Sequence, residues 1–144
     1  MSGIAAGTAF FSRTYDEAMS LLLEARNYAA VGEFRHRRAM APADRLLLCC
    51  ETMRLTARLT HVMAWLLAQR AVHAGEITLE ASADEPYVLG GQTTCLSESQ
   101  GIEQVGDDWL NELLDRSKRL YQRVSRLDEM VRREVGRPIE ENPA

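Results

Sequence analysis

The chain has 144 residues, the size of one ordinary domain and long enough to bury a core. Its first nine residues lack a basic start and a long apolar region, so we expect no signal peptide. The three cysteines, Cys49, Cys50 and Cys95, exclude a disulfide framework because two are adjacent, and they predict a protein of the reducing cytoplasm.

The charged residues are unevenly distributed. The formal net charge is −4, from 17 basic and 21 acidic residues. Residues 71–115 hold ten acidic residues and no Lys or Arg, which leaves 11 acidic and all 17 basic residues elsewhere. The sequence therefore predicts an acidic middle segment flanked by basic helices.

The first predicted helix covers residues 11–31. We expect residues 1–9 to be disordered, because they are small and polar and lie at a terminus. Gly32 is the predicted helix stop, and residues 33–41 are the predicted connection. A single apolar stripe is typical of an outer helix, and here it comprises Tyr15, Ala18, Met19, Leu22, Ala25 and Tyr28 with Ala29.

The second predicted helix runs from Pro42 to Gly75, since Pro suits the first helical position and Gly the residue just past the end. It has two apolar stripes, which predict a central helix with neighbours on both sides. Arg54, Arg58 and His61 interrupt the stripes, so no membrane span is expected. The first stripe is Leu46, Cys49, Cys50, Met53, Ala57, Thr60, Met63, Ala64, Leu67 and Ala71, and the second is Leu48, Leu55, Leu59, Val62 and Leu66. We interpret Cys49 and Cys50 as core residues.

A long polar loop, about residues 76–107, separates this helix from the last one, which we expect over residues 107–135. We predict that the loop is mobile and lies along the bundle surface. The last helix has a heptad seam of Leu110, Leu113, Ser117, Leu120, Val124, Leu127 and Val131. The predicted fold is all-α: an up-down-up three-helix bundle over residues 10–136, followed by a flexible tail, 137–144.

No pattern points to an enzyme, a metal or a cofactor. Glu33-x-x-His36 has the spacing of a di-iron ligand pair, but such sites need two of these pairs and two further Glu. The cysteines and histidines lack zinc-site spacing, and no nucleophile elbow, P-loop or dinucleotide fingerprint occurs. We therefore predict a non-enzymatic protein without catalytic, metal or cofactor residues.

Nucleic-acid binding is the more serious alternative. Arg35, His36, Arg37 and Arg38 form the densest basic run, and the last helix adds several Arg residues that could contact phosphates. The whole chain is nevertheless acidic, and the last helix interleaves acidic residues with its Arg residues. We therefore favour a solvated, salt-bridged helix face over a nucleic-acid interface.

One long motif carries a family resemblance. Residues 51–76 read ETMRLTARLTHVMAWLLAQRAVHAGE, which resembles the core pattern of the RcdA family, alphaproteobacterial regulators of CtrA degradation. Residues 10–19, FFSRTYDEAM, resemble the Caulobacter-type branch of that family. The resemblance covers about residues 10–135 and is looser in the last helix.

The resemblance implies a function that periodicity alone does not. RcdA proteins act as adaptors that help to deliver the response regulator CtrA to the ClpXP protease, beside companion adaptors. It implies a helical bundle, often a homodimer, without catalysis, and recruitment to the cell pole with the protease. A helical scaffold or a nucleic-acid-associated regulator remains the alternative.

Three groups of residues are candidates for partner binding. The acidic segment, represented by Glu80, Asp84 and Glu85, would attract a basic partner, because complementary charge steers encounter. The basic run, Arg35, Arg37 and Arg38, would contact another adaptor. Arg54, Arg58 and Arg70 are expected near one face of the central helix, where they either pair with neighbouring helices or form a partner-facing stripe; we lean towards pairing.

Overall fold

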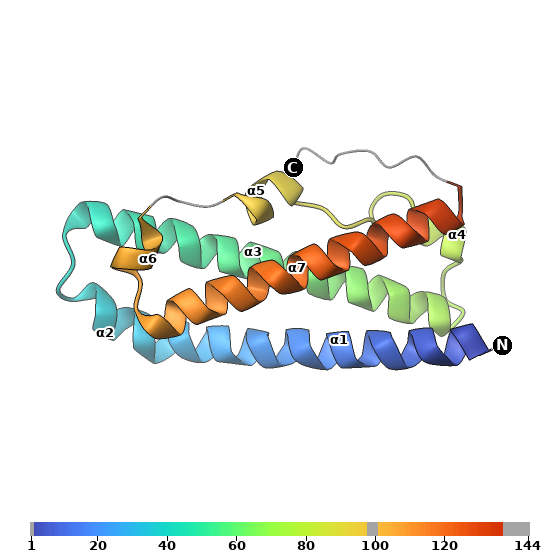
Figure 1. Cartoon of the computed structure of the whole chain (residues 1–144), viewed down its shortest axis with the longest axis horizontal. Coiled ribbons are helices and arrows are strands. Elements are labelled where there is room, and N and C mark those ends of the chain that lie inside the picture. The colour runs from blue at the N-terminus through green and yellow to red at the C-terminus, as the bar shows by residue number, and fades with distance from the viewer. Residues whose placement is uncertain (1, 98–100, 137–144) are drawn as a thin grey trace.

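The computed structural model describes residues 2–97 and 101–136, and it contains helices and connections but no strand within these ranges. Three long helices lie side by side (Figure 1): α1 (Ser2–Asn27), α3 (Pro42–His73) and α7 (Asp108–Glu134). The predicted all-α bundle with a long central helix is confirmed. The predicted tail, residues 137–144, lies outside the described residues.

Helix α1 begins at Ser2, whereas residues 1–9 are predicted to be disordered. No Pro interrupts this stretch, and its alanines have the highest helix propensity, so the helical backbone continues N-terminal to residue 11. The side chains that can be described begin at Phe11, which packs against the core of the bundle.

The helical path also continues past Gly32, so the prediction that Gly32 stops the first helix is wrong. A π-helical turn, η1 (Tyr28–Gly32), leads into the short helix α2 (Glu33–Arg37). A Cβ atom at Gly32 would lie 2.7 Å from the Tyr28 ring and 2.9 Å from the Trp109 ring. Gly32 therefore allows two aromatic rings to approach the backbone, rather than ending the helix.

Helix α3 has the predicted boundaries, with Pro42 in its first turn and Gly75 beyond its end at a positive φ of 77°. Helix α7 also has the boundaries predicted for it. It begins after Asp107, whose side chain accepts a hydrogen bond from the Leu110 N–H and so caps the helix N-terminus. The seam predicted for α7 is buried, except for Leu127, which packs at the edge of the core.

The direction of α7 differs from the prediction. Helix α7 runs parallel to α3 and antiparallel to α1, so the order is up-down-down rather than up-down-up (Figure 1). The contacts agree: Arg58 meets Leu114 while Trp65 meets Asp128 further along both helices. The reason is the length of the connection, since a chain must travel back along a bundle before a second parallel helix can start.

The connecting segment, residues 74–106, leads from the C-terminal end of α3 back to the N-terminal end of the bundle's α7. It contains α4 (Leu79–Ser82), α5 (Gln92–Leu96) and α6 (Ile102–Val105), which lie successively along the bundle (Figure 1). Leu89, Cys95 and Ile102 are buried in the main core. The predicted long polar loop is thus a partly helical crossover that apolar side chains anchor to α3 and α7.

Candidate partner-binding surface

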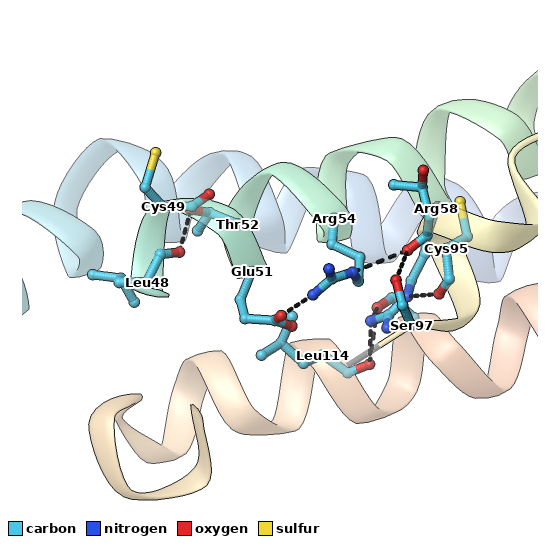
Figure 2. Close-up of polar contacts among 11 residues, drawn as sticks. Leu48, Cys49, Glu51, Thr52, Arg54, Arg58, Cys95, Ser97 and Leu114 are labelled. Atoms are coloured by element: carbon cyan, nitrogen blue, oxygen red, sulfur yellow. Dashed lines mark hydrogen bonds and ion pairs between the residues drawn. The ribbon is translucent and has the colours of Figure 1, made fainter. Parts of the chain in front are cut away.

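Arg58 belongs to the interior of the bundle. Its side chain is 1% exposed. Its Nε donates to the backbone oxygen of Cys95 at 2.7 Å, and its Nη1 donates to that of Leu114 at 3.1 Å and to the Ser117 hydroxyl at 3.2 Å (Figure 2). A central α3 side chain thus joins α5 to α7, and an external partner cannot reach it.

Arg54 is the second arginine on this side of α3. Its Nε donates to the Thr94 backbone oxygen at 2.9 Å, and its guanidinium forms an ion pair with Glu51, one turn earlier. Figure 2 shows Glu51, Arg54 and Arg58 pointing towards α5 and α7, while Cys49 points away from them. These contacts favour the interpretation that Arg54 and Arg58 hold the bundle together.

Arg70 lies elsewhere on α3, so the prediction that all three arginines share one face is wrong. Sixteen residues separate Arg54 from Arg70, which corresponds to roughly 160° around a helix. Arg70 is exposed, and its guanidinium carbon lies 5.7 Å from the centre of the Tyr15 ring on α1. It therefore faces α1 and solvent, as a cation over an aromatic ring.

A second internal network fixes the connecting segment. Asp128, in α7, accepts hydrogen bonds from the Trp65 indole at 3.0 Å and from the Leu89 backbone N–H at 3.5 Å, and it pairs with Arg132. Burial raises the pKa of the Asp128 carboxyl, although Arg132 opposes this. The Tyr121 hydroxyl donates to the Gly90 backbone oxygen at 2.6 Å. Apart from the Asp128–Arg132 pair, which lies within α7, these contacts join distant segments, so the sequence did not indicate them.

Cys95 is buried beside this network, and burial raises the pKa of its thiol. Cys49 and Cys50 are exposed, so the prediction that they are core residues is wrong. Both belong to the α3 stripe whose larger part is exposed.

The two apolar stripes of α3, which predict neighbours on both sides of the helix, differ in burial. The stripe of Leu48, Leu55, Leu59, Val62 and Leu66 is buried, as predicted. On the other stripe, Leu46 and Met53 are each 67% exposed and Leu67 is 48% exposed. The apolar spacing was visible in the sequence, but nothing there showed that the described helices leave these three side chains exposed while Ala57 and Met63 of the same stripe pack against the core.

A groove lies beside the C-terminal half of this exposed stripe. Its volume is about 830 Å³. The floor includes the small residues Ala64, Ala68 and Ala71, and the facing wall includes Pro86 and Tyr87 of the connecting segment. Trp65 and Leu67 also line the groove on the α3 side.

The predicted acidic and basic surfaces lie at opposite ends of α3. Glu80, in α4, and Asp84 and Glu85, just after it, are exposed near the C-terminal end of α3. Arg35 and Arg37 of α2 and the following Arg38 are exposed near its N-terminal end. Figure 1 shows α2 and α4 at the two ends of the bundle. The fold keeps these two charged groups apart.

Several Arg residues of α7 pair with carboxylates. Arg123 contacts Glu17 at 2.6 Å, and Arg116 contacts Glu24 at 2.7 Å, so both tie α7 to α1. This confirms the predicted salt-bridged face of the last helix.

The remaining sequence candidate, His36, lies against α6. Its Nε2 is 2.6 Å from the Val105 backbone oxygen. Among the residues that the structure describes, no three His, Cys, Asp or Glu side chains gather as metal ligands would. Within the same ranges, no helix combines the length and apolar character needed to cross a membrane.

Comparison with known proteins adds two findings. Residues 5–144 match the family model described as a protein of unknown function, DUF1465. The crystal structure of RcdA from Caulobacter crescentus CB15 is similar, with 36% sequence identity and a TM-score of 0.67 over 84% of this chain and 89% of that one. No curated protein matches the chain.

Proposed function

Because the chain belongs to the RcdA family, we propose that it is a non-enzymatic adaptor that helps to deliver a CtrA-like response regulator to the ClpXP protease. The proposal includes companion adaptors and a homodimer as partners, and recruitment to the cell pole with the protease. The observation that carries it is the 36% identity to RcdA across most of both chains, together with the shared bundle.

The distribution of charge supports separate binding surfaces for cargo and for a companion adaptor. The acidic end, with Glu80, Asp84 and Glu85, would attract a basic cargo such as the DNA-binding domain of a transcription factor. The basic end, with Arg35 and Arg38, would contact a companion adaptor. The two groups are exposed and lie at opposite ends of α3, so two partners could bind without competing. Charge of this kind accelerates encounter and selects partners more than it adds affinity.

The internal arginines support the proposal in a different way. Arg54 and Arg58 hold α3 against α5 and α7, so they stabilise the platform on which partners would bind. Arg54 and Arg58 of the family motif in residues 51–76 therefore serve the assembly of the bundle, and the exposed candidates for partner contacts are Arg70 within the motif and the two charged ends outside it.

The direct test is degradation of purified CtrA by ClpXP with the companion adaptors present. Adding this protein should accelerate the loss of CtrA while the protein itself stays intact. A control reaction lacks the companion adaptors, and a second one replaces CtrA with a protein that ClpXP degrades without adaptors. If the rate of CtrA loss is the same with and without this protein, delivery of CtrA is disproved. Stoichiometric metal or a salt-sensitive shift of DNA would support the other functional classes instead.

A further inference from the structure

Trp109 is a large aromatic side chain at the surface, in the first turn of α7. Its indole is 38% exposed, and it lies outside the buried seam that faces the core. The start of α7 lies beside η1, at the end of the bundle where α2 lies (Figure 1). Tryptophan is among the residue types most enriched at the energetic centres of protein interfaces. Its exposure here marks a point of contact for a partner.

The structure holds the Trp109 ring in one orientation. The ring lies against the backbone of Gly32, where a Cβ atom would come within 2.9 Å of it. The Tyr28 ring meets it edge to face, with the ring centres 5.2 Å apart and an angle of 83° between the planes. Tyr28 is completely buried, so this support is part of the core. A side chain that is already ordered loses little conformational entropy when a partner binds it.

The backbone against the ring is the π-helical turn η1. Such turns are rare and occur frequently at functional sites. Its two ends, Tyr28 and Gly32, are buried, whereas Val31 is 47% exposed. Residues 28–32 carry no charge, so Val31 extends the apolar surface next to the residue on which Trp109 rests. We call the exposed pair Val31 and Trp109 the Trp109 patch.

The charge around the Trp109 patch is uneven. On the α2 side, Arg35 is exposed and follows Gly32 by three residues, about one helical turn. No ion pair among the described residues includes Arg35. On the α7 side, Asp108 and Glu112 are exposed, and Glu112 lies 3.8 Å from Arg116. A partner that covers the patch therefore gains most from a carboxylate on the α2 side.

We infer that the Trp109 patch binds an exposed apolar side chain of a companion adaptor, and that a neighbouring carboxylate of the same adaptor pairs with Arg35. The inference deepens the companion-adaptor part of the proposed function and rests on that part. It assigns no second partner to the basic end of the bundle.

The apolar patch supplies what the basic end lacks. Charge accelerates encounter and selects partners, but it adds little affinity on its own. Affinity comes mainly from a few anchors at a desolvated centre, which the surrounding polar contacts shield from water. An ordered tryptophan beside an exposed arginine is such a combination, and hydrogen bonds between an arginine and a carboxylate strengthen where water is excluded.

A single-stranded nucleic acid is the other class of partner that uses an exposed aromatic ring beside a basic residue, because bases stack on such rings. Asp108 and Glu112 lie one residue before and three residues after Trp109, where they would repel a phosphate backbone. A protein can place neutral or basic groups beside these carboxylates. The surroundings of Trp109 therefore favour a protein.

Fluorine NMR tests the contact directly, because the chain has two tryptophans, Trp65 and Trp109. Protein labelled with 5-fluorotryptophan should give two resonances, which Trp65→Phe assigns. The unlabelled companion adaptor of the degradation assay should shift or broaden the Trp109 resonance and leave that of Trp65, which is 1% exposed, in place. CtrA alone, whose proposed surface lies at the other end of α3, and a single-stranded oligonucleotide should shift neither resonance.

Calorimetric titration of the same adaptor tests the energetics. Val31→Glu should weaken binding at least tenfold, because it puts a negative charge into the apolar patch beside the partner's carboxylate. Arg35→Gln should weaken binding at least threefold. Leu23→Glu, at a 43% exposed position on α1, is the matched control and should leave the affinity unchanged. Melting temperatures of Val31→Glu and Leu23→Glu should agree, since both side chains are similarly exposed.

The outcomes separate the inference from the proposed function. If the companion adaptor binds while the Trp109 resonance stays in place, or if Val31→Glu and Leu23→Glu bind it equally well, the inference is overturned and the proposed function stands. If CtrA delivery persists although no companion adaptor binds the chain, the companion-adaptor part of the proposed function fails, and the inference fails with it. A shift of the Trp109 resonance by the oligonucleotide would overturn the inference in favour of nucleic acid.

Discussion

The guanidinium of Arg58 lies between the backbone oxygens of Cys95 and Leu114, 2.7 and 3.1 Å from them. One side chain of the central helix therefore satisfies carbonyl groups on the connecting segment and on α7. A buried charge is tolerated when several acceptors surround it, and removing it leaves those acceptors unpaired.

Arg58→Met should therefore lower the free energy of unfolding by about 3 kcal/mol, because it keeps most of the side-chain volume and removes the buried hydrogen bonds. Urea denaturation followed by circular dichroism measures the change. Arg70→Met is the matched control on the same helix and should cost less than about 1 kcal/mol, since Arg70 is exposed. Equal losses for the two variants would contradict a structural role that is special to Arg58.

Asp128→Asn should change how stability depends on pH. Burial raises the pKa of Asp128 in the folded protein above its ordinary value near 4, so folding favours the protonated carboxyl. The contribution of this group to stability is then fully present below the ordinary pKa and is lost as pH rises through the folded pKa. The asparagine keeps an oxygen for Trp65 and Leu89 but does not titrate.

The stability of the wild type relative to Asp128→Asn should therefore fall as pH rises from about 4 towards neutrality. Thermal melts of both proteins across this range measure it. Asp115→Asn controls for the loss of one surface carboxylate, because Asp115 is 67% exposed on α7. A growing advantage of the wild type would show that folding favours ionised Asp128, and a constant one would show that folding does not shift its pKa, so either result would contradict the prediction.

Two of the three thiols should react rapidly in the folded chain. Cys49 and Cys50 are exposed, whereas Cys95 is buried and burial raises the pKa of its thiol, which keeps the reactive thiolate scarce. With a chromogenic thiol reagent at low protein concentration, two thiols per chain should react rapidly, and the third should react only in denaturant. The Cys49→Ser, Cys50→Ser double variant should have no fast thiol. A fast thiol in that variant would place Cys95 at the surface.

Neutralising the acidic end should weaken the capture of basic cargo. The variant Glu80→Gln, Asp84→Asn, Glu85→Gln should bind a CtrA-like DNA-binding domain at least fivefold more weakly at low salt, and the gap should close as salt screens the charges. Fluorescence anisotropy gives both affinities. The matched control, Glu103→Gln, Glu112→Gln, Asp115→Asn, removes the same charge elsewhere. Unchanged binding across the salt titration would exclude this surface, and parallel sedimentation runs detect any change of the dimer.

The family and the helices were predictable from the chain alone. Caps, stops and apolar spacing located α3 and α7 to within a few residues, because these signals act within one or two turns of a helix. The motif in residues 51–76 indicated the family that the comparison with RcdA supports. Gly32 shows the limit of such local signals, since its role depends on Trp109, far along the chain.

Tertiary structure decided the direction of α7, the role of the arginines and the exposure of one α3 stripe. Local spacing reports that a face is apolar, but the burial of that face depends on which distant segments pack against it. The long connection carried the chain back along the bundle, so α7 runs parallel to α3. Leu114 and Asp128 of α7 therefore accept hydrogen bonds from Arg58 and Trp65 of α3. That packing covered one stripe of α3 and left Leu46, Met53 and Leu67 at the surface.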